Sequence, residues 1–129
     1  MIKTKCVYSG YSSKADGFRV LVTRFRGRGL ETSRYDAWVA SLGPSEELLQ
    51  KIQSSQITWS EFQRRYRKEL FEPAPIDRHN RTIKNHGQKF TLRLLKALSD
   101  RGQLTLLCHC PDDQPHCHRN TLKKILESI

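Results

Sequence analysis

The stretch from residue 88 to residue 128 constrains the fold most, because it has the pattern of a helix, a buried strand and a second helix. Residues 88–100 repeat apolar side chains at helical spacing, and Gly102 follows as a C-terminal stop. Residues 103–108 are mostly apolar, with Gly102 before them and a polar run after them, which predicts a buried strand. Helical spacing returns over residues 119–128. This order predicts an α/β fold with a mostly parallel sheet flanked by helices.

The spacing also predicts which side chains the two helices bury. The first helix is expected to bury Phe90, Leu94, Leu95 and Leu98, and the last one Leu122, Ile125, Leu126 and Ile129.

The first half of the chain is expected to begin with two strands. Residues 2–8 are compatible with a strand, and residues 9–17, rich in Gly, Ser and Asp, predict a loop. Residues 18–25 are β-branched and largely apolar, which predicts an inner strand.

Two helices and a basic loop are expected next. Ser45 is a candidate N-cap of a short helix. A capping box at Thr58 and Glu61 predicts the start of a longer helix with a salt-bridged face, which ends before Pro73. Residues 73–88 carry few apolar side chains and predict a basic loop.

Length and composition favour one domain inside the cell. A chain of 129 residues, 36% of them hydrophobic, is long enough for a single core, so residues 1–129 are expected to form one domain. We expect no membrane association, because no run of 18 apolar residues and no signal-peptide pattern occurs. Four unevenly spaced cysteines are typical of thiols or ligands in a reducing compartment, which favours the cytoplasm.

The net charge of +10 is concentrated in two regions. Residues 1–34 hold eight Lys and Arg against two acids, and residues 73–101 hold seven against two. Such a field favours a polyanionic partner such as a nucleic acid or a nucleotide, although a basic surface that only maintains solubility is an equal alternative. The pattern indicates neither a substrate nor an oligomeric state.

Three of the four cysteines lie within ten residues, between the predicted strand and the last helix. The expected pocket lies outside the carboxyl end of the strand, where helix N-termini also gather. One interpretation is an anion or phosphate pocket built from the helix N-terminus and Arg119, with Cys108 or Cys117 as nucleophile or redox thiol and His118 as proton carrier.

Two other interpretations stay open at this stage. The cluster could hold zinc or iron through Cys108, Cys110, His116 and Cys117, although the spacing is not that of a zinc finger. It could also be purely structural, since cysteine is often buried for packing alone. A non-catalytic nucleic-acid-binding module that uses the two basic regions is a further alternative.

The sequence resembles the family known as domain of unknown function 488. The resemblance covers most of the chain and rests on the two Cys motifs, the early Tyr-Ser pair, an arginine-bearing strand end, a Pro-Ser helix start and an aromatic helix. These are Leu106-Leu107-Cys108, Cys117-His118-Arg119, Tyr8-Ser9, Arg24 with Arg28-Gly29, Leu42-Gly43-Pro44-Ser45, and Phe62 with Tyr66.

This resemblance implies a compact α/β fold with a functional pocket at the cysteine motif, and it supplies no reaction. It also draws attention to ligand-binding candidates away from that motif, namely Tyr8, Ser9, Arg24, Arg28 and Gly29. If the two strand ends are neighbours in one parallel sheet, Arg24, Arg28 and Arg119 would converge on one anion. The alternative is that these arginines form salt bridges or lie in solvent.

Overall fold

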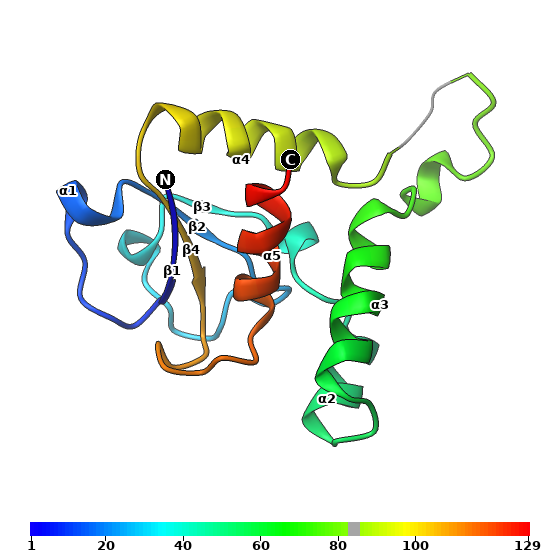
Figure 1. Ribbon diagram of the computed structural model, residues 1–129, viewed down its shortest axis with the longest axis horizontal. Helices are drawn as coiled ribbons and strands as arrows, with labels where there is room; N and C mark the ends of the chain where they lie inside the picture. The colour runs from blue at the N-terminus through cyan, green and yellow to red at the C-terminus, as the bar shows by residue number, and fades with distance from the viewer. Residues whose placement is uncertain (83–85) are drawn as a thin grey trace.

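The computed structural model describes residues 1–82 and 86–129, and these residues form a parallel four-stranded sheet with helices packed against it (Figure 1). The strands are β1 (Ile2–Cys6), β2 (Phe18–Leu21), β3 (Ala37–Trp38) and β4 (Leu104–Cys108), and their order in the sheet is β1-β4-β2-β3. Every pairing is parallel. The predicted α/β fold is therefore confirmed, and the last strand lies in the middle of the sheet.

The helices supply much of the main core. They are α1 (Ser13–Asp16), α2 (Glu46–Gln53), α3 (Trp59–Phe71), α4 (Lys89–Arg101) and α5 (His118–Glu127), with short 3₁₀ helices at Thr32–Arg34, Ala40–Leu42 and Pro75–Asp77. Within the described residues, no helix is both long and apolar enough to span a bilayer.

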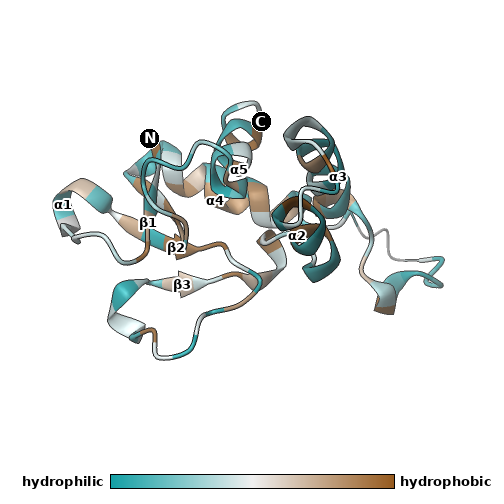
Figure 2. Ribbon diagram, turned by 90° about the horizontal axis from the view of Figure 1, so that it is seen from below, coloured by the Kyte–Doolittle hydropathy of each residue, from teal (hydrophilic) through white to brown (hydrophobic). Residues whose placement is uncertain are grey.

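The two faces of the sheet carry separate apolar clusters, because successive side chains of a strand point to opposite sides. Leu106 joins a large cluster with buried residues from α2, α3, α4 and α5. Leu107 joins a smaller cluster on the other face with Val7, Leu21 and Leu30. Figure 2 shows β2 largely in brown and parts of α2 and α3 in teal.

Local sequence signals explain where α2 and α3 begin. The Ser45 side chain accepts a hydrogen bond from the Leu48 backbone, and Thr58 accepts one from Glu61, as predicted. The other half of the capping box is wrong: the Glu61 carboxylate accepts hydrogen bonds from Arg64 and Arg65 instead. Both arginines lie one turn along the helix, where their charge competes for the carboxylate.

Two expectations about the first 25 residues need correction. The segment 9–17 contains the short helix α1, and the Asp16 carboxylate accepts a hydrogen bond from the Ser12 backbone N–H just before this helix begins. Strand β2 ends at Leu21, short of residue 25, because the Thr23 hydroxyl donates to the Phe25 carbonyl and turns the chain away from the sheet.

The buried face of α4 also differs from the prediction. Leu95 is buried as expected, but the other core positions of this helix are Leu92 and Ser99. The predicted residues Phe90, Leu94 and Leu98 are exposed, and so is Ile129 after α5. Two apolar rows repeat at helical spacing along α4, and periodicity alone does not choose between them. In the segment 73–88, residues 83–85 lie outside the described residues.

Candidate functional site

Cys108 and Cys117 lie side by side at the carboxyl end of the sheet. Cys108 is the last residue of β4, and Cys117 is the N-cap of α5, so the loop of residues 109–116 carries the chain out and back to the same point. The two Sγ atoms are 3.4 Å apart, and the residues are 4% and 3% exposed. Both thiols are free. The structure thus brings together the two cysteines of the predicted pocket.

His118 completes the cluster as the first residue of α5. Its Nε2 lies 2.7 Å from the Val22 carbonyl oxygen, which accepts only, so Nε2 carries the hydrogen. In the neutral ring Nδ1 then presents a lone pair, and it is 4.0 Å from each of the two Sγ atoms. The ring is buried edge-on against Tyr66, with centroids 5.7 Å apart. A thiol pair therefore faces one oriented proton acceptor.

The surroundings change the acidity of two thiols in opposite directions. The hydrogen bond with Cys108 lowers the pKa of Cys117 most, and the Arg119 backbone N–H and guanidinium charge lower it further, while burial opposes them. Cys110 also interacts with both sulfur atoms, and the bond with Cys108 together with burial raises the pKa of Cys110. The thiolate form is therefore favoured at Cys117 relative to Cys110.

Arg119 is 1% exposed and organises the loop from within. Its NH1 donates to the Cys110 carbonyl oxygen at 2.8 Å, and its NH2 donates to that of Pro111 at 2.6 Å. Nε has no hydrogen-bond partner within residues 1–82 and 86–129. The guanidinium is thus engaged by backbone carbonyls, so Arg119 acts on the thiols through its charge and through the shape of the loop.

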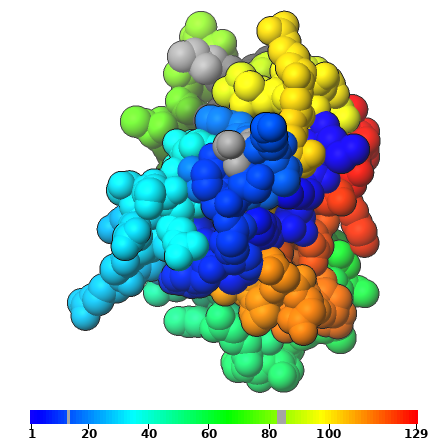
Figure 3. Space-filling view, turned by 90° about the vertical axis from the view of Figure 1, so that its left-hand side faces the viewer, coloured from blue at the N-terminus to red at the C-terminus, as the bar shows by residue number. Residues whose placement is uncertain are grey.

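Asp112 fastens the same loop to the end of β1. Its carboxylate accepts hydrogen bonds from the Cys6 backbone and the Ser9 hydroxyl, and the bond from Ser9 lowers the pKa of Asp112. Figure 3 shows the orange segment after β4 next to the blue N-terminal residues. Tyr8 is exposed and lies against the His109 ring, with centroids 5.7 Å apart. Tyr8 and Ser9 are therefore placed where they position the loop.

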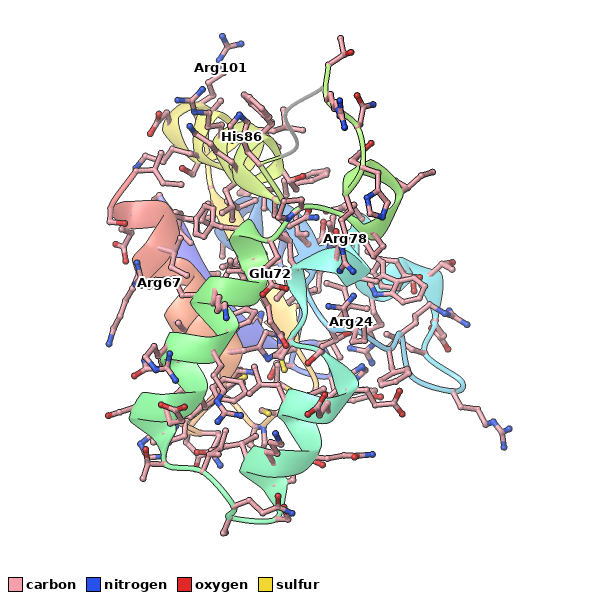
Figure 4. The ribbon with its side chains drawn as sticks, turned by 90° about the vertical axis from the view of Figure 1, so that its right-hand side faces the viewer. Arg24, Arg67, Glu72, Arg78, His86 and Arg101 are labelled. Carbon is pink, nitrogen blue, oxygen red and sulfur yellow. The ribbon has the colours of Figure 1, made fainter. Side chains whose placement is uncertain are left out.

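A cavity of about 170 Å³ opens beside the thiols. Its lining residues are Thr23, Arg24, Phe25, Pro44, Leu49, Gln53, Cys108, His109, Cys110 and His118. Arg24 donates to the carbonyl oxygens of Gly43 at 2.6 Å and Pro44 at 3.2 Å, and Figure 4 shows it beside the segment that leads into α2. Arg28 is exposed, and neither it nor Gly29, at φ +76°, lines this cavity. Of the three arginines, Arg24 alone lines the cavity with Cys108.

A second, more open groove of about 490 Å³ lies on the other side of Cys110. Its walls include Trp59 and His116, whose rings stack with centroids 4.9 Å apart. Gln53 and Cys110 line both this groove and the cavity beside the thiols. Cys110 therefore stands between the buried cluster and a broad surface depression.

The geometry of the cluster also suits a metal ion. The ligand atoms of Cys108, Cys117 and His118 all lie within 4.8 Å of one another. Cys110 lines the same cavity as Cys108 and His118, whereas His116, a candidate from the sequence, stacks on Trp59. The imidazole in this cluster is that of His118, whose other ring nitrogen donates to the Val22 carbonyl oxygen, as is usual for metal-binding histidines.

Sequence reasoning missed the groups that orient the site. The Val22 carbonyl is invisible to a side-chain motif, although the pairing of β2 with β4 places it beside Cys108. Tyr66 could have been suspected, because a buried tyrosine needs a partner for its hydroxyl, and it donates to the Leu42 carbonyl.

Comparison with known proteins found one family. Residues 2–129 match a family model described as the active DUF488-N3 subclade. No curated protein and no solved structure gave a match.

Proposed function

The chain belongs to the DUF488 family, and on that premise we propose that it is a thiol-dependent enzyme whose reacting pair is Cys108 and Cys117. One observation carries the proposal: two thiols 3.4 Å apart share one imidazole nitrogen, 4.0 Å from each, on a ring fixed through its other nitrogen. A nucleophile, a base and a group that orients the base are the parts that nucleophilic catalysis requires.

Cys108 is proposed to attack first, because it lines the cavity. Its proton passes to His118 Nδ1, and its thiolate attacks one sulfur of a disulfide substrate, so that a mixed disulfide forms and one half leaves as a thiolate. Cys117 then attacks the Cys108 sulfur. A Cys108–Cys117 disulfide forms, the second half of the substrate leaves with the proton of Cys117, and the substrate has been reduced by two electrons.

The disulfide substrate is proposed to be anionic, with a disulfide that carries a phosphate or nucleotide group as the first class to test. Arg24 in the cavity wall and the net charge of +10 support this choice. Nucleic acid remains a proposed partner on the charge alone. A cytoplasmic location is proposed because the thiols are free.

Alkylation of individual cysteines tests the role of His118. Wild type and His118→Gln are treated with iodoacetamide at neutral pH, and each cysteine is followed by peptide mass spectrometry. We expect alkylation of Cys108 to slow by at least about tenfold in the variant, because the thiol loses its proton acceptor. Cys6, which lies at the end of β1, is the internal reference and should be unchanged. Equal rates at Cys108 in both proteins would remove His118 from the mechanism.

The donor geometry supports a metal centre as a second candidate function. Zinc bonds of about 2.3 Å to sulfur and 2.0–2.1 Å to nitrogen place tetrahedral ligand atoms about 3.5–3.8 Å apart, close to the distances in the cluster. Cys108, Cys110, Cys117 and His118 would hold zinc or iron. Elemental analysis of protein purified without added metal separates the two functions, since stoichiometric metal favours the metal centre and its absence favours the free thiols.

A further inference from the structure

Cys110 occupies a position that neither of the two other clustered cysteines shares. It follows β4 by two residues, and Arg119 holds its carbonyl oxygen. Its side chain lines both the 170 Å³ cavity beside the thiols and the open 490 Å³ groove. Cys110 is half-buried, so it is the member of the cluster that solutes in the groove can reach.

The reacting pair itself is poorly accessible. Cys108 and Cys117 are almost fully buried, and neither lines the open groove. A disulfide between them would face the smaller cavity, through Cys108, and not the open groove. Cys110 lines the open groove and also the cavity that Cys108 lines, so it lies between the two spaces.

We propose that Cys110 is a relay thiol that carries reducing equivalents from a small soluble thiol in the open groove to the buried Cys108–Cys117 pair. The inference rests on the proposed thiol function and adds to it the route by which the oxidised site is restored.

The relay consists of thiol–disulfide exchanges in which atoms and electrons balance. The Cys110 thiolate attacks the Cys108 sulfur, so a Cys108–Cys110 disulfide forms and Cys117 leaves as a thiolate. A small thiol then attacks Cys110 from the groove, forms a mixed disulfide there and releases Cys108. A second small thiol attacks this mixed disulfide, frees Cys110 and leaves as the external disulfide. Two external thiols are oxidised, and their protons remain on the protein thiols.

The test compares reduction rates of the oxidised protein. Metal-free wild type, Cys110→Ser and the control Cys6→Ser are oxidised with diamide, and the recovery of free thiols with glutathione is followed by alkylation and mass spectrometry. Cys6 is also half-buried, but it lies at the end of β1, outside both cavities. We expect Cys110→Ser to recover at least about tenfold more slowly than wild type and Cys6→Ser to match wild type.

A second measurement does not depend on how the serine variant folds. Peptide mapping of wild type during reduction should detect the Cys108–Cys110 disulfide and glutathione on Cys110. Equal recovery in Cys110→Ser, or glutathione found first on Cys108 or Cys117, would overturn the relay and leave the reacting pair intact. Failure of wild type to form any Cys108–Cys117 disulfide would overturn the relay together with the proposed thiol function.

Discussion

His118 shows how one side chain gains a chemical role from its neighbours. The motif predicts that His118 lies near the start of the last helix, next to Cys117. The tautomer of His118 is set by the Val22 carbonyl, which accepts a hydrogen bond from Nε2, so that the lone pair of Nδ1 faces the sulfur atoms. Backbone acceptors contributed by another strand depend on strand order, so the orientation of the ring could not be predicted from the motif.

Asp16 is a buried charge that supports the edge of the sheet beside the site. It is 1% exposed and pairs with Lys3 at 2.6 Å and Lys5 at 3.1 Å. Burial alone would raise its pKa, but hydrogen bonds from Lys3, the Ser12 backbone and Lys5 outweigh burial and lower the pKa from 3.8 to about 2. Its charged form is therefore more stable in the folded chain than in the unfolded one.

The lowered pKa predicts a stability change in acid. A carboxyl group whose pKa is depressed by folding stabilises the fold above its unfolded pKa, and the contribution disappears as the pH falls from about 4 to about 2. Replacing Asp16 with Asn should lower the free energy of unfolding by about 2 kcal/mol at neutral pH and by much less at pH 2. Urea denaturation of wild type and variant at both pH values measures this change in the free energy of unfolding. Asp100→Asn, at an exposed ion pair, is the control. A loss that is the same at both pH values would contradict the assignment.

Helix α4 shows the limit of reading a buried face from periodicity. Its bounds were predicted closely, from the apolar repeat and from Gly102, which follows its last residue. The buried face of α4 was not predicted correctly, because Leu94 and Leu95 belong to different apolar rows. Leu95 is 4% exposed and Leu94 is 62% exposed. The choice between rows depends on the strands and on α5, which only the assembled fold supplies.

This difference can be tested with two adjacent substitutions. Leu95→Ala should lower the free energy of unfolding by about 3 kcal/mol, because it empties a space in the main core. Leu94→Ala, one residue away on the same helix, should change it by less than about 0.5 kcal/mol. Denaturant melts of both variants provide the comparison. Similar losses in the two variants would show that both rows of α4 are buried in solution.

The whole molecule places the cysteine motif in the middle of a parallel sheet. The helix, strand, helix pattern predicted the fold class, and parallel strands with β4 next to β2 bring their carboxyl ends together as expected. The proximity of Cys108 to Cys117 could be inferred, since a strand end and the next helix start meet at that edge. The burial of Arg119 could not be inferred from the sequence, because it depends on how the loop of residues 109–116 folds back over the side chain.

The measurement that tests the central claim most directly is a disulfide map of the metal-free protein after oxidation with one equivalent of diamide. If Cys108 and Cys117 are a reacting pair, peptide mass spectrometry should find one major disulfide, between these two residues, while Cys6 stays reduced. Free Cys108 and Cys117 after oxidation of Cys6 or Cys110 to other products would contradict the account.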